Sequence, residues 1–334
     1  MATLTFDARL LKQIMFWSIL GFLLYWLMDI AIMLFIAYII MAAIMPAVKR
    51  FEEYGLPRWA SVVSVYLVII LIVGVGMGLT FGPFLGEMQR FFSAVPMFVQ
   101  ESIVRLNIEG TPFQPYILDA LSTISKQLAT VPLDAVRFGA SVFGGVLDVI
   151  MMLIFTFYFS LENERIHKFL VAVIPTNDKK NYKNLFTLID SKLGSWLRGE
   201  LILMTIIGVV TYLILRVIGL PFALPLAIIA GILEIVPIIG PIISAIPAIL
   251  VALAVSPVQV VVVVVAFILI QQLEGSIVVP RVMKHAVGLD PLVVLIALLI
   301  GGKLGGPMGA LLSVPVVAVI FILYNAWVVD QKLK

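Results

Sequence analysis

The sequence contains 334 residues, of which 62% are hydrophobic and 12% are charged, and its mean hydropathy is +1.17. A soluble domain is roughly 45–50% apolar and about 25% charged, because its surface needs polar cover. These values exclude a soluble globular protein and a disordered chain. They predict an all-α polytopic membrane protein.

Charge and reactive residues exclude further classes. The 22 basic and 19 acidic residues give a net charge of +3, which is too small to indicate nucleic acid as a partner. The sequence has no cysteine, and its two histidines, His167 and His285, lie far apart, so we expect no disulfide and no metal site. No GxSxG, HExxH or P-loop motif occurs, and we predict neither enzyme activity nor a cofactor.

The membrane segments follow from apolar stretches of about 20 residues, the length that crosses a bilayer as a helix. The first stretch, 14–48, suits a hairpin that turns at Asp29. Single spans are predicted at 60–81, 142–159, 201–218 and 257–273. Two further blocks, 222–255 and 291–329, are interrupted by glycine and proline. We therefore predict about eight helical membrane segments.

The distribution of charge predicts the orientation. Basic residues outnumber acidic residues in 161–200, whereas acidic residues are in excess in 83–140. Because basic loops stay in the cytoplasm, segment 83–140 is predicted outside, and both termini are predicted on the cytoplasmic side. The membrane is predicted to be the cell (inner) membrane.

These features divide the chain into four units. The units are a three-span unit at 1–82, extracytoplasmic amphipathic helices at 83–140, a fourth span with an interfacial helix at 141–200, and a transport core at 201–334. Within 83–140, an apolar stripe over 117–131 predicts a helix that lies on its own protein or contacts another subunit. Within 141–200, the apolar face of 178–198 predicts a helix in the inner headgroup layer.

The transport core contains an internal repeat. PLAIIAGILEIVPIIGP begins at Pro225, and PLVVLIALLIGGKLGGP begins at Pro291, an offset of 66 (291 − 225). Proline interrupts helical hydrogen bonding, and irregular backbone in a membrane survives only inside protein or beside water. We therefore predict two broken hairpins, either re-entrant or fully spanning, that are related as an inverted repeat and line a polar pathway.

Ionisable side chains within these segments are candidates for function, because burying one in a bilayer costs at least about 2.5–3.5 kcal/mol. Glu234 lies three residues before Pro237 in the first break. Its carboxylate is predicted either to carry a proton or cation, or to accept hydrogen bonds from amides that the break leaves free.

Two other polar features lie close to the breaks. Gln271, Gln272 and Glu274 end the span 257–273, where they either form part of a site or reach the inner headgroups. Lys303 in the second break either supplies a counter-charge or extends to the interface.

Several motifs resemble those of the autoinducer-2 exporter (AI-2E) family of membrane proteins. GILEIVPIIGP at 231–241 is similar to the family signature GxxExxPxxGP, and VPRVMK at 279–284, VGLDPL at 287–292 and GGPMGALLSVP at 305–315 extend the resemblance. It implies roughly eight helical segments and a homo-oligomer, with a pentamer as its suggested form. The residues that it assigns to a site are Glu234, Pro237, Gly240, Pro241, Gln272, Glu274, Pro280, Arg281, Gly306 and Pro307.

The resemblance also implies a function. We expect a secondary transporter that exports small molecules, such as the signalling compound autoinducer-2, by alternating access. Some family members are linked instead to sodium or lithium/proton antiport. A pore and a non-transporting membrane scaffold are the alternatives from other classes. The expected partners are the bilayer and a small-molecule or cation substrate.

Overall fold

The computed structural model describes residues 27–105, 115, 119, 123, 146–173, 179–284 and 288–332, and these residues form helices joined by short turns. The helices are α2 (Met28–Glu53), α3 (Arg58–Arg105), α5 (Val146–Val173), α6 (Lys179–Val217), α7 (Ala223–Leu233), α8 (Ile239–Val255), α9 (Pro257–Leu273), the π-helical turn η1 (Glu274–Val278), α10 (Val279–Val282) and α11 (Pro291–Lys332).

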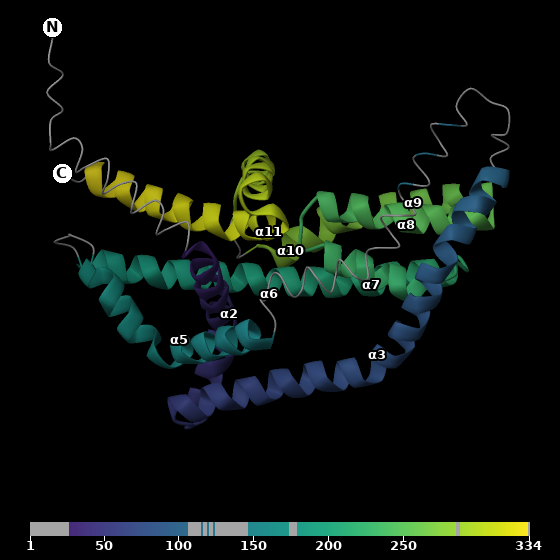
Figure 1. The fold of residues 1–334 in the computed structure, drawn as a ribbon. Coiled ribbons are helices and arrows are strands. Elements are labelled where there is room, and N and C mark those ends of the chain that lie inside the picture. The colour runs from purple at the N-terminus through teal and green to yellow at the C-terminus, as the bar shows by residue number, and fades with distance from the viewer. Residues whose placement is uncertain are drawn as a thin grey trace, which may run out of the picture.

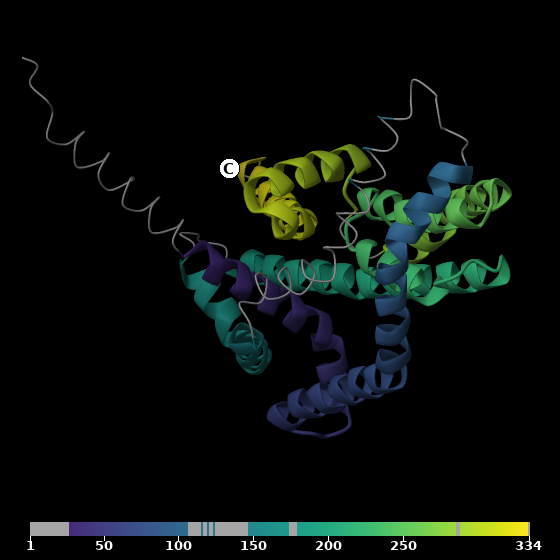
Figure 2. The ribbon, with the colours of Figure 1, turned by 45° about the vertical axis from the view of Figure 1, so that its right-hand side comes forward.

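Helix α6 is the central element of the molecule (Figure 1). One half of α6 packs against α2 and α5, the other half packs against α7 and α9, and α11 also contacts it. Helix α3 packs on α2 near its start and reaches α7 and α8 near its end, so it connects the two halves (Figure 2).

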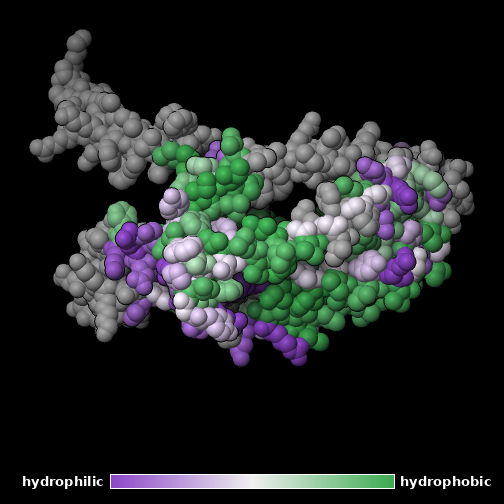
Figure 3. Space-filling model, turned by 90° about the horizontal axis from the view of Figure 1, so that it is seen from below, coloured by the Kyte–Doolittle hydropathy of each residue, from purple (hydrophilic) through white to green (hydrophobic). Residues whose placement is uncertain are grey.

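Five of the described helical segments are long and apolar enough to cross a membrane: Met28–Glu53, Arg58–Gly76, Asn184–Val217, Pro257–Val282 and Pro291–Asn325. Large apolar side chains remain exposed along them, as a protein surrounded by lipid requires. Figure 3 shows hydrophobic residues covering much of one face, with hydrophilic residues gathered toward its edges. The prediction of an all-α, multi-pass membrane protein is confirmed. The number of about eight segments and the inverted repeat stay predictions.

The predicted unit boundaries differ from the helix ends. Helix α3 continues through the boundary at 82/83, and α6 continues through the boundary at 200/201. A change from polar to apolar sequence therefore marks a change in what the helix contacts. The first part of the hairpin 14–48 and nearly all of the stripe 117–131 lie outside the described residues.

The apolar face that we expected in the headgroup layer packs on protein. Ile189, Leu193 and Trp196 of α6 are buried in a cluster that includes Ile39 of α2 and Leu312 of α11. Contacts with other helices thus account for the amphipathic pattern of 178–198.

Glycine allows two helix crossings on α6. An added Cβ at Gly194 would collide with the carbonyl oxygen of Ala42 in α2. At the other crossing, a Cβ at Gly231 of α7 would lie 2.8 Å from the carbonyl oxygen of Met204 and 3.2 Å from Cα of Gly208. Close backbone contact of this kind is typical of helix packing in membranes.

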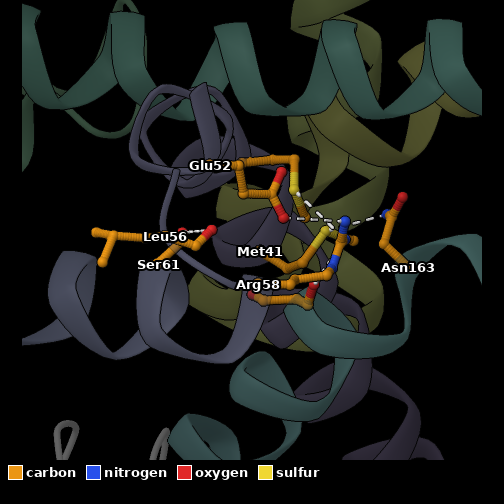
Figure 4. A network of polar contacts seen from close by, with 8 residues as sticks. Met41, Glu52, Leu56, Arg58, Ser61 and Asn163 are labelled. Atoms are coloured by element: carbon orange, nitrogen blue, oxygen red, sulfur yellow. Dashed lines mark hydrogen bonds and ion pairs between the residues drawn. The ribbon is translucent and has the colours of Figure 1, made fainter. Parts of the chain in front are cut away.

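A polar network fixes the turn between α2 and α3 (Figure 4). The Arg58 guanidinium donates hydrogen bonds of 3.1 and 2.8 Å to the carbonyl oxygen of Ser160 in α5, and it lies 3.5 Å from the Glu52 carboxylate. In the same view, Asn163 of α5 contacts the Met41 sulfur at 3.4 Å. These contacts join α2 and the start of α3 to the middle of α5.

Both glycine- and proline-rich blocks contain a break, but the breaks differ. In α11 the backbone leaves helical geometry at Gly305 and at Gly306, whose φ is +59°. The two arms of α11 then meet at Gly301 and Gly309, where a Cβ on either residue would collide with the other residue's backbone. In the first block the chain turns at 234–238, before Gly240 and Pro241, which lie in the first turn of α8.

Candidate functional site

Three buried glutamates lie where α6, α7 and α9 meet. Glu200 is in the middle of α6, Glu234 directly follows α7, and Glu274 begins the π-helical turn after α9. Their exposed fractions are 2%, 2% and 7%. A buried ionisable group in a membrane protein is a candidate for function, because its burial costs stability unless a role retains it.

The glutamates interact with one another. The carboxyl groups of Glu234 and Glu274 lie close enough to interact, and Gln271 Nε2 donates a 3.0 Å hydrogen bond to Glu274 Oε2. Oε2 of Glu234 is buried and has no hydrogen-bond partner. A hydrogen bond between two carboxyl groups requires a proton on one of them, because an ionised carboxylate only accepts. Two carboxyl groups this close can therefore share one proton.

This acidic cluster has no basic counterpart in the described part of the chain. The ion pairs found there involve the acids Glu52, Glu162 and Asp190. A buried carboxylate without a partner is unfavourable, and it attracts protons or cations. The site is therefore complementary to positive charge.

An apolar cavity of about 390 Å³ adjoins the cluster. Helices α6, α7, α8 and α9 all contribute to its lining, which is mostly aliphatic. Its polar lining residues are Thr211, Ser244, Gln271 and Glu274. Thr211 Oγ1 is fully buried without a hydrogen-bond partner, and Ser244 Oγ donates to the carbonyl oxygen of Pro241 at 2.9 Å. Glu274 belongs to both the cavity and the acidic cluster.

The turn between α7 and α8 positions Glu234. Ile238 adopts a φ of +70°, which is a genuine outlier for a β-branched residue. An added Cβ on Gly240 would collide with the carbonyl oxygen of Leu233, so the chain folds back tightly there. Strain of this kind persists only where the surroundings enforce it, and it is often found at functional sites.

The structure brings four of the predicted residues together: Glu234, Glu274, Gln271 and Pro241. Pro237 lies in the strained turn, and Gly240 packs beneath it.

The other predicted residues lie elsewhere. Gln272 is exposed, and so is Arg281, which donates a 3.5 Å hydrogen bond to the carbonyl oxygen of Ile277. Lys303, Gly306 and Pro307 belong to the break in α11, where Lys303 is exposed. None of these five residues lines the cavity.

Sequence reasoning missed Glu200, Thr211 and Ser244. Glu200 was not identified as a candidate because the boundary between a basic helix and a membrane span was predicted at that residue. Had 179–217 been predicted as one helix, Glu200 would have been the acid next to its apolar half. Thr211 and Ser244 carry no comparable signal, since hydroxyl side chains are common in membrane helices.

Helices of membrane-spanning length around a buried polar site define a multi-pass membrane protein of the transport class. The chain belongs to the AI-2E transporter family, because the sequence model described as "AI-2E family transporter" matches residues 14–329. The resemblance noted in the sequence is thereby confirmed.

Curated relatives agree with this class. "Putative transport protein YrrI" of Bacillus subtilis is 27% identical over 307 residues, which cover 89% of this chain and 86% of the relative. "Putative transport protein YhhT" of Escherichia coli K12 is 28% identical over 302 residues, or 87% and 83%. "Putative permease PerM" of the same organism is 28% identical over 218 residues, or 63% and 62%. These relatives are described as transport proteins or permeases and not as enzymes.

Proposed function

We propose that the protein is a secondary transporter that exports small molecules by alternating access, with the Glu234–Glu274 pair as its proton carrier. The observation that carries this proposal is the pair of neighbouring carboxyl groups, buried without a basic partner at the edge of the cavity. The AI-2E family membership supports transport as the function. Residence in the inner membrane, cytoplasmic termini and a homo-oligomer, of which the family resemblance suggests a pentamer, belong to the same proposal.

Protonation would couple to movement through the two irregular segments that hold the pair. Glu234 lies at the strained turn between α7 and α8, and Glu274 begins the π-helical turn η1. Loss of the shared proton places two negative charges side by side, and their repulsion favours separation of these segments. Binding of a proton or a cationic substrate restores the closed pair. Single π-helical turns inside helices are frequently functional, which fits this role for η1.

Sodium or lithium/proton antiport is the second candidate, and the acidic cluster is the observation that favours it. Within the described residues, however, no group of three or more His, Asp or Glu side chains is arranged to hold a metal ion. We therefore rank transport of an organic solute above transport of a metal cation.

The test uses purified protein in liposomes that contain a pH-sensitive dye, with a panel of solutes and imposed proton or sodium gradients. We expect solute flux to move protons, and we expect Glu234→Gln to abolish both movements. Glu164→Gln, at an exposed position of α5, is the matched control and should behave as the parent protein. Full proton-coupled flux by the Glu234→Gln protein would remove Glu234 from the mechanism.

A further inference from the structure

We propose that the cavity between α6, α7, α8 and α9 binds a protonated organic amine with an apolar body, and that the ammonium group faces Glu274. This assignment of a substrate class rests on the proposed transport function. It is carried by the lining of the cavity, the hydrogen-bonding state of its polar groups and the charge of the adjacent cluster.

The lining sets the character of the ligand's body. Aliphatic side chains such as Ile207, Ile249 and Val264 dominate the wall, together with Phe267. A cavity of about 390 Å³ falls in the range of small-molecule sites. A polyhydroxylated solute would leave hydroxyl groups without partners against this wall, which is unfavourable. The wall therefore selects an apolar body.

The polar groups of the cavity offer acceptors. The Gln271 amide nitrogen donates to Glu274, which leaves the amide oxygen to face a ligand. The Ser244 hydroxyl donates to the carbonyl oxygen of Pro241, so the hydroxyl can only accept a hydrogen bond from a ligand. Thr211 Oγ1 is fully buried in the cavity wall and has no partner, and its hydroxyl can accept as well as donate. A ligand that forms hydrogen bonds to Gln271 and Ser244 must therefore bring donors.

Charge then decides between donor groups. Glu274 lines the cavity, Glu234 lies beside it, and Glu200 is near enough to interact electrostatically with Glu234. No described ion pair neutralises any of the three. A carboxylate ligand would be repelled, and an alcohol would supply one donor without charge. A primary ammonium group supplies three N–H donors and a positive charge, so it fits best.

Three ligands that share one body test the assignment: 2-phenylethylammonium, 2-phenylethanol and 3-phenylpropanoate. We measure saturable binding to the purified full-length protein by calorimetry at pH 7. We expect the ammonium compound to bind at least about tenfold more tightly than the alcohol, because a charge-assisted hydrogen bond is worth about 1.5–3 kcal/mol. We expect no saturable binding of the carboxylate.

Variants locate the binding. Glu274→Gln should remove the preference for ammonium over alcohol while binding of the alcohol remains. Ile249→Trp should fill the cavity and abolish binding of both ligands. Thr211→Val, which removes an acceptor at constant volume, should weaken ammonium binding about fivefold, and it replaces Glu274→Gln if that protein fails to fold by circular dichroism and gel filtration. Glu164→Gln should bind as the parent protein does.

Equal binding of all three ligands, as expected for a cavity that holds a lipid chain, would overturn the proposal. So would ammonium binding that Glu274→Gln, Thr211→Val and Ile249→Trp leave unchanged. The proposed function fails separately: an amine that binds in the predicted way but never crosses a liposome membrane supports the site and contradicts transport. Conversely, Glu234-dependent flux of a solute that is not an amine would support transport and overturn the amine assignment.

Discussion

Helix α6 carries an acid in each of two buried polar clusters, and the clusters differ in how their acids are compensated. Near the start of α6, Asp190 accepts hydrogen bonds from the Tyr38 hydroxyl and, at 3.2 Å, from Asn163 Nδ2. His167 Nε2 lies 3.0 Å from the same carboxylate. Ten residues further along, Glu200 approaches two more acids and no described base.

The difference is one that the proposed function explains. The donors around Asp190 come from α2 and α5, so satisfying this one carboxylate holds three helices together. The glutamate cluster contains more acceptors than donors, and it contributes little that apolar residues would not contribute better. A cluster of this kind beside a cavity is what the proposed transport function would retain.

The largest expected effect is on transport. Replacing Glu234 by Gln removes the titratable carboxyl and supplies an amide donor that can bond to Glu274. We expect proton-coupled flux in liposomes to fall at least about tenfold, while the apparent melting temperature stays the same or rises. A large loss of thermal stability in this variant would show that Glu234 supports the fold, and the contrast between the clusters would then fail.

Replacing Asp190 by Ala should have the opposite pattern. Tyr38 and Asn163 would lose their common acceptor, His167 would lose the neighbouring carboxylate, and leaving donors unpaired costs about 2–3 kcal/mol. We expect a clear drop in the apparent melting temperature, measured by intrinsic fluorescence in detergent. Flux per folded molecule should change little. Asp148→Ala, at an exposed position of α5, is the matched control for stability.

A smaller effect is expected at the crossing of α6 and α7. Gly231→Ala adds a methyl group 2.8 Å from the carbonyl oxygen of Met204, and overpacking of this kind costs about 1–3 kcal/mol. We expect reduced thermal stability. We also expect reduced flux, because a wider spacing of α6 and α7 would move Glu234 away from Glu200. Gly86→Ala, with open space around its Cβ, should change neither quantity.

The smallest effect is expected at the start of α9. The Ser256 hydroxyl accepts a 3.1 Å hydrogen bond from the backbone nitrogen of Gln259 and caps the helix. Ser256→Ala should cost about 1 kcal/mol of stability and leave flux unchanged. Ser256→Asp, which can still accept the bond, should retain the parent melting temperature. A loss of flux in Ser256→Ala would place the α8–α9 turn in the mechanism.

Much of the fold and part of the site could be predicted from the sequence, because intramembrane charges are rare. That rarity identified Glu234 and Glu274, which the structure places in contact. The first break was predicted at Pro237–Pro241; the chain turns at 234–238, and Gly240 and Pro241 already lie in the first turn of α8. Proline is tolerated in the first turn of a helix, because the backbone N–H groups there have no acceptor within the helix.

Glu200 shows why the remainder could not be predicted. Local composition changes at residue 200 from a basic helix to an apolar one, and that change resembles a boundary. Whether the helix continues depends on neighbours far away in sequence, here α2 on one half and α7 on the other. Contacts of this kind leave no periodic signal in a single sequence. The cavity was unpredictable for the same reason, because four helices form it.

The continuity of α6 has a mechanical consequence. Its 39 residues form a rod of about 58 Å, and Asp190 and Glu200 lie about 15 Å apart along it. Because Asp190 anchors one half of this rod to α2 and α5, α6 belongs to a fixed frame. In the proposed mechanism, opening of the cavity then comes from the α7–α8 hairpin sliding across the glycine contact of Gly208 and Gly231. The absence of side chains at these two glycines would let the hairpin slide along α6, so that Glu234 moves relative to Glu200.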